Sequence, residues 1–353
     1  MNAFYSCDWG TTSFRLRRID AATGEILSER RQPMGVKMLL GHLPTDDQPS
    51  REKQCEEFLR AQLLSLVDDQ THLLAGAEVL ISGMASSSVG WRELAYAMVP
   101  VRLDGSGLVQ ARFDLQINAT ARAHVRLISG VRTGNNIMRG EETELLGIFA
   151  EGKFDALARH GLVILPGTHS KHIRLEHRRM TDFQTYMTGE LFEVLSSHSL
   201  LRASVEPTVD PSSPGLLDRA SRDAFLAGVD CAAQAGLAAG LFRTRVRTVL
   251  NGVQPAVNRW FLSGLLIGAE AADFGKFHSA TPVLIAAPEP LSTAYALAFE
   301  HLGPHSSLTV LPPERMASAS VRGHRVLLAG PHPVTEESGD SDRITPAAAR
   351  EPC

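Results

Sequence analysis

The chain has 353 residues, more than one hydrophobic core usually holds, and 44% of them are hydrophobic, so we expect two domains with a core in each. Its 35 basic and 39 acidic residues are well mixed and leave a net charge of −4, which excludes the electrostatic footprint of a protein that binds nucleic acid or an anionic membrane. We therefore expect a small-molecule partner.

The cysteines at positions 7, 55, 231 and 353 are widely spaced and form no Cys-x-x-Cys pair, which fits reduced thiols in the cytosol. No apolar run precedes Asp8, so we expect no signal peptide. The apolar segment 261–272 is too short and too interrupted to span a membrane. These features predict a cytoplasmic protein and leave a homodimer open.

The sequence opens on a predicted β-hairpin, over residues 3–19, with a glycine turn. Gly10 would let the backbone approach an anion, and Thr11 and Thr12 offer N–H and O–H donors. Asp8, at the end of the first strand, could hold a hydrated magnesium ion. If this turn is considered alone, an ordinary hairpin is the favoured interpretation. A similar turn downstream reverses the preference in favour of a phosphate loop.

Apolar spacing next predicts strands and a helix, at 24–28 (strand), 52–67 (helix), 77–83 (strand) and 124–129 (strand). The order strand, helix, strand indicates a mostly parallel sheet, in which ligands lie beyond the carboxyl ends of the strands. The serine-rich loop after residue 83, with Trp91, would then lie at the rim of a cleft. A plain surface loop is the favoured reading for the serines themselves.

A predicted helix begins near Arg139 and carries Glu141, Glu142 and Glu144 in its first turn. Carboxylates there compensate the helix dipole, which would explain all three. A helix start beside a phosphate cleft is also where a general base would lie, and one carboxylate would suffice.

The second half opens on a turn that repeats the first: apolar strand, glycine, hydroxyls, strand. Here Gly167, Thr168 and His169 lead to Lys171, one of only five lysines, whose point charge suits a phosphate group. Two such hairpins, one opening each half, indicate a pair of phosphate loops.

The remaining sequence predicts helices at 183–201, 217–241, 256–274, 291–302 and 314–328, and a strand at 282–287. Gly264 and Gly268 would allow close approach of a nucleotide base, although close helix packing is the favoured single cause. We expect lobes at 1–150 and 151–330, and a disordered tail at 331–353, where apolar residues are scarce.

Six stretches together resemble the 2-dehydro-3-deoxygalactonokinase family, sugar-acid kinases of the actin/hexokinase/Hsp70 ATPase superfamily. They are residues 8–12, 83–91, 136–143, 166–171, 187–191 and 261–270, and they follow the family's order. The resemblance implies an α/β fold with two actin-like (ribonuclease H-like) lobes, each a mixed sheet flanked by helices, with ATP and magnesium between them. It also implies transfer of the γ-phosphate to the 6-hydroxyl of 2-dehydro-3-deoxy-D-galactonate, a step of galactonate catabolism.

Carried over, the resemblance places the first phosphate loop and the sugar-acid side in the first lobe, and the second loop and the adenosine side in the second. We assign the base to Glu141, with Glu142 in reserve, and the substrate carboxylate to Arg139, with Arg15 next, because a guanidinium pairs well with a carboxylate. For either arginine an ion pair with a neighbouring acid is equally open. Asn135 and Asn136 could bind the keto and hydroxyl groups, and Trp91 could close the apolar side.

Residues 286–290 read Ala-Ala-Pro-Glu-Pro where the family has a glycine-containing turn beside the adenosine. This difference motivates a second hypothesis, a sugar-acid sensor that kept the fold without catalysis. A third is a phosphohydrolase of the same superfamily.

Overall fold

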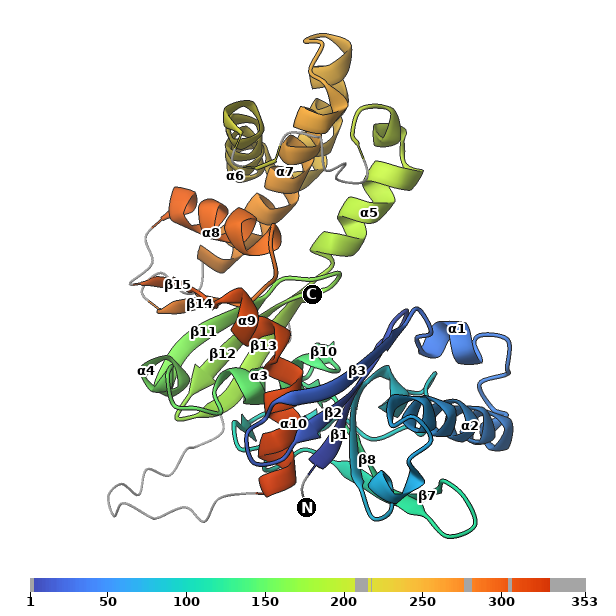
Figure 1. Ribbon diagram of the computed structural model, residues 1–353. Coiled ribbons are helices and arrows are strands. Elements are labelled where there is room, and N and C mark those ends of the chain that lie inside the picture. Colours follow the sequence, from blue (N-terminus) through green and yellow to red (C-terminus); the bar gives the residue numbers. More distant parts are fainter. Residues whose placement is uncertain (1–2, 207–214, 217, 276–280, 304–306, 331–353) are drawn as a thin grey trace.

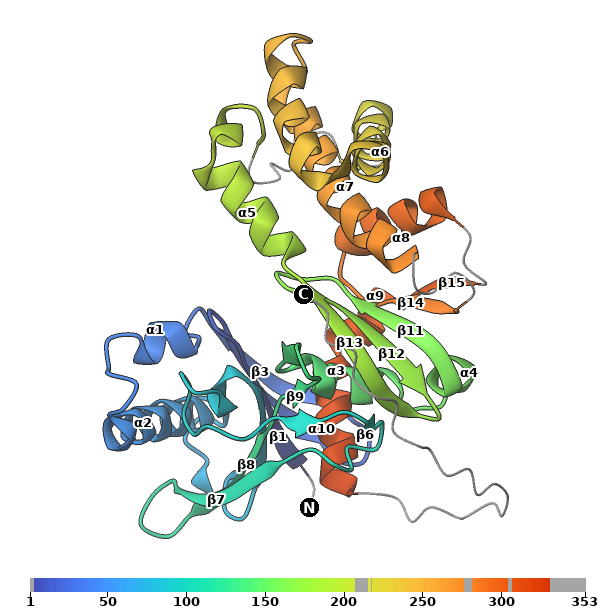
Figure 2. The same ribbon diagram turned by 180° about the vertical axis from the view of Figure 1, so that it is seen from behind.

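The computed structural model describes residues 3–206, 215–216, 218–275, 281–303 and 307–330. Its strands form two six-stranded sheets and one three-stranded sheet. Figures 1 and 2, which view the molecule from opposite sides, show that each large sheet has its own set of helices. The mixed, two-lobed α/β architecture expected from the sequence is therefore present.

The first sheet has the order β3-β2-β1-β4-β8-β7. Its strands are β1 (Ala3–Trp9), β2 (Phe14–Asp20), β3 (Ile26–Gln32), β4 (Glu78–Gly83), β7 (Gln110–Gln116) and β8 (Arg122–Ile128). β4 runs parallel to β1 and β8, and the other pairs are antiparallel. The expectation of a mostly parallel sheet was wrong, because the short turns at both edges favour antiparallel pairs over crossovers.

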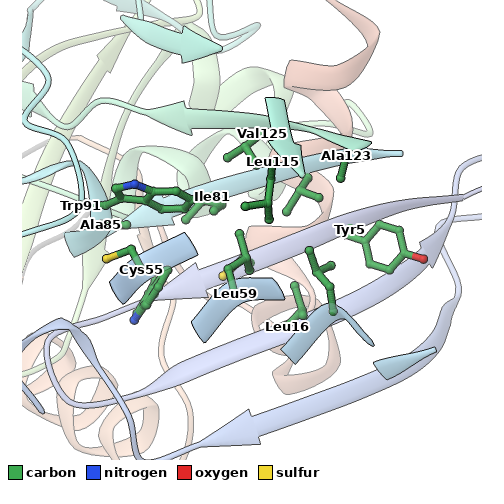
Figure 3. Close-up of a cluster of buried hydrophobic side chains, with 14 of the residues drawn as sticks. Tyr5, Leu16, Cys55, Leu59, Ile81, Ala85, Trp91, Leu115, Ala123 and Val125 are labelled. Carbon is green, nitrogen blue, oxygen red and sulfur yellow. The ribbon is translucent and has the colours of Figure 1, made fainter. Parts of the chain in front are cut away.

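The first sheet packs against α1 (Val36–Leu40) and α2 (Gln48–Leu66). The core between sheet and helix includes Leu16, Leu59 and Ile81, all fully buried (Figure 3). Helix α2 begins four residues earlier than predicted, because Asp47 accepts a hydrogen bond from the Ser50 amide and a proline occupies its first turn.

The second sheet has the order β15-β14-β11-β12-β13-β6. Its strands are β6 (Val101–Arg102), β11 (His160–Leu165), β12 (Ser170–Glu176), β13 (Arg179–Tyr186), β14 (Val283–Ile285) and β15 (Leu308–Val310). Residues 183–186, predicted to be helical, extend β13 as the antiparallel partner of β12. Phe183 is buried in the sheet core, and this packing outweighs the helical pattern.

Helices α6 (Arg219–Val249), α7 (Pro255–Gly275) and α8 (Leu291–Leu302) cover one face of the second sheet, whereas α5 (Thr188–His198) extends beyond the end of β13 (Figure 1). By length and composition α6 alone, within the part of the chain described, resembles a membrane-spanning helix. It packs along α7, where a Cβ on Gly264 would lie 2.0 Å from the Phe225 carbonyl oxygen and one on Gly268 would lie 2.7 Å from the Val229 Cα. These glycines permit close helix packing, the favoured reading.

The last helices return to the first sheet. The predicted single helix is divided into α9 (Pro313–Ala317) and α10 (Ala319–Ala329). Helix α10 crosses α3 (Glu141–Ile148) closely, since a Cβ on Gly147 would lie 1.8 Å from the Ala319 carbonyl oxygen. The Ser6 hydroxyl of β1 also lies 2.7 Å from Nδ1 of buried His324.

The smaller elements are α4 (Asp155–Arg159) and the three-stranded sheet of β5 (Ala97–Met98), β9 (Val131–Arg132) and β10 (Ile137–Met138). Strand β6, from the first half of the chain, joins the second sheet, and α10, from the second half, packs against the first sheet. The lobe boundary near residue 150 therefore stays a prediction. The predicted tail lies outside the described residues. Cys7, Cys55 and Cys231 are buried and free.

Candidate active site

A cleft lies between the turn that follows β1 and the turn that follows β11. Nine of the seventeen residues predicted for the site line it: Asp8, Gly10, Thr11, Arg139, Glu141, Gly167, Thr168, His169 and Lys171. Met84, Tyr96 and Glu144 line it as well. The two glycine turns therefore face one common space.

Backbone contacts hold the first turn in place. The Gly10 amide donates to the Ser13 carbonyl at 2.9 Å, and the Thr11 carbonyl accepts from the Lys37 amide at 3.0 Å. A Cβ on Gly35 would lie 2.3 Å from Thr11 backbone atoms, so α1 can support the turn only with glycine there. Thr12 is exposed and does not line the cleft.

Carboxylates gather on the first-lobe side of the cleft. Burial raises the pKa of Asp8, with Arg15 opposing and the charge of Glu141 adding to the rise. Burial, followed by repulsion from Asp8 and Glu141, raises the pKa of Glu144 to about 8. The sequence offered one signal for Glu144: it follows Glu141 by three positions, on the same helix face.

These oxygens fit a magnesium ion, which prefers carboxylates, keeps several waters and takes further ligands from phosphates. A cation would also relieve the repulsion among the carboxylates. No three His, Cys, Asp or Glu side chains among the described residues form a ready-made metal site. The arrangement therefore suits an ion shared with a substrate.

Lys171 connects the two sides of the cleft. Its Nζ lies 2.9 Å from Oε1 of Glu141 and donates to the His169 carbonyl at 2.7 Å, and its side chain is 3% exposed. The His169 ring is engaged elsewhere, because its Nε2 lies 2.5 Å from Oε2 of Glu190. The cation of the second turn thus faces the predicted base directly.

Glu142, the predicted reserve base, does not face the cleft. It is fully buried, and its carboxylate accepts hydrogen bonds from the Gly140 amide at 2.7 Å and the Thr143 hydroxyl at 3.0 Å. Burial, with a smaller contribution from Glu141, raises its pKa to about 7. The Glu142 side chain therefore binds the start of α3 from the protein interior instead of facing the cleft.

Arg139 lines the cleft, and first-lobe groups orient its guanidinium. Nη1 donates to the Ser86 hydroxyl at 2.6 Å, and the guanidinium carbon lies 4.2 Å from the centre of the Tyr96 ring. The Arg139 amide also donates to Oε2 of Glu141 at 3.0 Å. The same loop thus presents a cation and a carboxylate to one space.

The other predicted substrate contacts lie outside the cleft lining. Nε of Arg15 lies 3.6 Å from Oε1 of Glu29, so Arg15 forms the ion pair with a neighbouring acid that the sequence left open. The Asn136 side chain accepts from the Thr185 amide at 3.0 Å, and Asn135 is exposed beside it. Trp91 is fully buried in the core because its ring packs among other aromatic rings rather than against solvent (Figure 3).

A second cavity adjoins the cleft at Gly167 and Thr168, which line both. Its other walls are the start of α5 (Thr188, Gly189, Phe192), one face of α7 (Arg259, Trp260, Ser263, Leu266, Ile267) and the start of α8 (Pro290, Leu291, Ala294, Tyr295). Gly264 and Gly268 lie on the other face of α7. Helical spacing at 260, 263 and 267 is the signal in the sequence for the face of α7 that lines this cavity.

The replacement of the family's glycine turn does not close this second cavity. Ala286 and Ala287 are buried at the end of β14, and Pro290 and Leu291 form the wall beyond them. Apolar and aromatic side chains line most of it, as is usual in pockets that bind an organic ring.

Comparisons with known proteins identify the family of the chain. The profile of the 2-keto-3-deoxy-galactonokinase family matches residues 8–322. The chain is 29% identical to an Escherichia coli protein named "2-dehydro-3-deoxygalactonokinase" and 32% identical to a Rhizobium meliloti protein named "Probable 2-dehydro-3-deoxygalactonokinase DgoK1"; each match covers 85% of this chain and 90% of the relative.

A crystal structure described as that of "a putative 2-dehydro-3-deoxygalactonokinase protein from Sinorhizobium meliloti" superposes with a TM-score of 0.71 at 27% identity, covering 92% of this chain and 99% of that one. This match confirms the fold expected from the sequence. The family match confirms the expected class of enzyme, a carbohydrate kinase. The chain belongs to the 2-keto-3-deoxy-galactonokinase family.

Proposed function

We propose that this protein transfers the γ-phosphate of ATP to the 6-hydroxyl of 2-dehydro-3-deoxy-D-galactonate. The observation that carries the proposal is that the two cavities share the turn residues Gly167 and Thr168 in their linings. A nucleotide whose base occupies the cavity between α5, α7 and α8 would lay its phosphates over this turn. Its γ-phosphate would then reach the carboxylates and Lys171.

The chemistry asks for positioning and charge rather than covalent catalysis. Asp8 would hold a magnesium ion through water, and the charge of that ion would offset the charge on the phosphoryl oxygens. The amides of both turns would bind phosphate oxygens, as successive N–H groups in glycine turns do.

The ion pair between Lys171 and Glu141 supports a specific order of events. An arriving γ-phosphate offers Lys171 a stronger anionic partner than Glu141. Release from Lys171 would leave the Glu141 carboxylate free to accept the proton of the sugar hydroxyl. The hydroxyl oxygen then bonds to the γ-phosphorus as the bond to the β,γ-bridging oxygen breaks, and ADP leaves.

Arg139 is the best candidate for the substrate carboxylate, because it lines the cleft beside Glu141 and is oriented by Ser86 and Tyr96. Arg15, engaged with Glu29, stays second. The site residues carried by this proposal are thus Asp8, Arg139, Glu141 and Lys171 with the two turns. We expect the sugar acid and ATP to be the partners and the cytoplasm to be the location.

A panel of 2-keto-3-deoxy acids, assayed for ADP release with ATP and magnesium, tests the proposal. We expect ADP release to depend on the acid and to be fastest with the galactonate derivative. Release at the same rate without any acid would indicate the phosphohydrolase. Failure to bind nucleotide at millimolar concentration, measured by calorimetry, would favour the sensor.

A further inference from the structure

A buried carboxylate lies behind the second phosphate turn. Glu270, in α7, is 3% exposed and has four hydrogen-bonding partners. Its Oε1 accepts from the Ser170 hydroxyl at 2.6 Å and lies 2.6 Å from Nε2 of His172. Its Oε2 accepts from the Tyr295 hydroxyl at 2.8 Å and from the Thr188 hydroxyl. Each carboxylate oxygen therefore has two partners.

Such a group is costly to bury, because a carboxylate loses its hydration and repays the loss only when its partners are complete. Here the partners do more than offset burial. Burial raises the pKa of Glu270, but the hydrogen bond and charge of His172, then the hydroxyls of Ser170 and Thr188, bring it below its usual range. The carboxylate is thus held ionised within the lobe.

Two of the four partners lie in different walls of the cavity assigned to the nucleotide, and a third lies just beyond the phosphate turn. Thr188 begins α5 and Tyr295 lies in α8, and both line the cavity. Ser170 follows Thr168 of the phosphate turn by two residues. Glu270 itself follows Ile267, in the wall formed by α7, by about one turn of that helix.

The start of α5 is also in direct contact with the phosphate turn. A Cβ on Gly189 would lie 2.5 Å from the Gly167 carbonyl oxygen, and the Glu190 amide donates to the Thr168 carbonyl at 3.0 Å. A shift of Thr188 away from Glu270 would therefore move the turn as well. The hydrogen bond of Thr188 to Glu270 and the contact of α5 with the turn thus link this carboxylate to the phosphate turn.

We propose that Glu270 is a positioning residue for the nucleotide: it joins α5, α7, α8 and the second phosphate turn so that base and phosphates are bound at the correct separation. Glu270 acts through Thr188, Tyr295 and Ser170 and needs no contact with the nucleotide. This role rests on the proposed function, because it assumes that the cavity binds ATP.

Glu270→Gln tests the role with little change in size. The amide replaces one acceptor oxygen with two N–H donors, so the partners of that oxygen must turn to accept a hydrogen bond or move away. We expect the Kd for ADP and for a non-hydrolysable ATP analogue with magnesium, measured by calorimetry, to rise about tenfold or more, because small displacements of positioned groups are costly. The KM for the sugar acid should stay within about twofold.

Ser170→Ala is a milder variant for the case in which Glu270→Gln does not fold. It removes one donor and changes no residue that lines either cavity. We expect a rise of about twofold to fivefold in the nucleotide Kd, since three partners remain. The sugar-acid KM should again be unchanged.

The matched control is Asn258→Ala, in the same helix. Asn258 is fully buried, its Nδ2 donates to the Thr244 carbonyl at 2.7 Å and the Ser204 carbonyl at 3.0 Å, and it lines neither cavity. It should lower the melting temperature while leaving the nucleotide Kd within about twofold of the wild type. If Glu270 had only a structural role, Glu270→Gln would likewise lower the melting temperature and leave the nucleotide Kd unchanged.

An unchanged nucleotide Kd in Glu270→Gln and Ser170→Ala, beside a wild type that binds nucleotide, would overturn the role of Glu270 alone. An equal rise in Asn258→Ala would also overturn it. A wild type that binds no nucleotide would overturn the role together with the proposed function.

Discussion

The two glycine turns share a backbone pattern and differ in charge. The first lies beside the carboxylates of Asp8, Glu141 and Glu144, whereas the second carries Lys171. One side of the cleft therefore suits a cation and the other suits a phosphate. An ion pair between Nζ of Lys171 and Oε1 of Glu141, 2.9 Å apart, joins these two sides.

Two buried glutamates, Glu142 at the start of α3 and Glu270 in α7, have opposite pKa shifts. Glu142 receives a backbone amide and one hydroxyl, and its pKa rises to about 7. Glu270 receives three hydroxyls and a histidine, and its pKa is lowered. The comparison shows that the number and charge of the donors, rather than burial alone, decide whether a buried carboxylate stays ionised.

The largest expected effect belongs to the acidic side. Glu141→Gln should lower kcat roughly 10²- to 10⁴-fold, because that is the usual contribution of a general base. The Kd for ATP should change little. Steady-state kinetics with the sugar acid, together with calorimetry, measures both values, and full turnover would remove Glu141 from the role.

Lys171→Met should come next, with roughly a hundredfold loss of kcat/KM, since a cation aimed at the transferred phosphoryl group contributes on this scale. Lys171→Arg, which keeps the charge, is the control and should recover part of the loss. If Lys171 and Glu141 act as a unit, the double variant should lose much less than the product of the two single losses. Independent, multiplicative losses would argue against the exchange of partners.

Arg139→Met should raise the KM for the sugar acid about tenfold, at the lower end of the cost of losing a charge-assisted contact, because Ser86 and Tyr96 already engage the guanidinium. The KM for ATP should be unaffected. Arg15→Met is the comparison variant. A larger effect on the sugar-acid KM from Arg15 than from Arg139 would move the carboxylate site.

The smallest effect concerns stability and pH. The pKa of Glu142 rises from 4.5 to about 7 on folding. Between these two pH values the folded state therefore keeps the Glu142 carboxyl protonated, whereas the unfolded state does not. Its contribution to the free energy of unfolding is complete below the lower value and is lost as the pH rises through about 7. As the pH rises from about 5 to about 8, the free energy of unfolding of Glu142→Gln should therefore fall less than that of the wild type.

Urea denaturation at several pH values measures this difference. Glu270→Gln provides the contrast, because the lowered pKa of Glu270 keeps it ionised across the same window. Its stability should fall with pH as steeply as that of the wild type. Equal slopes for Glu142→Gln and the wild type would contradict the contrast between the two glutamates.

Much of this fold was predictable from local patterns. Both hairpins, α8 and the glycine turns follow from alternation, helical spacing and turn residues, which act over short distances. Residues 183–186 were misread because pairing with β12 decided their conformation. Trp91 was misplaced for a related reason: no local pattern distinguishes an aromatic ring at a cleft rim from one packed against Trp9.

The site was predictable where the backbone itself forms it. Asp8, Lys171 and Glu141 converge because each lies near an end of an element that meets the cleft, at the end of β1 and the starts of β12 and α3. Glu270 could not be predicted, because its partners lie in β12, α5 and α8, between 25 and 100 positions away.

Transfer of isotopically labelled γ-phosphate from ATP to the sugar acid tests the central claim most directly. The account predicts one label per ADP formed, attached to the 6-oxygen of 2-dehydro-3-deoxy-D-galactonate and detectable by mass spectrometry and phosphorus NMR. Label recovered as inorganic phosphate, with the sugar acid unchanged, would contradict it.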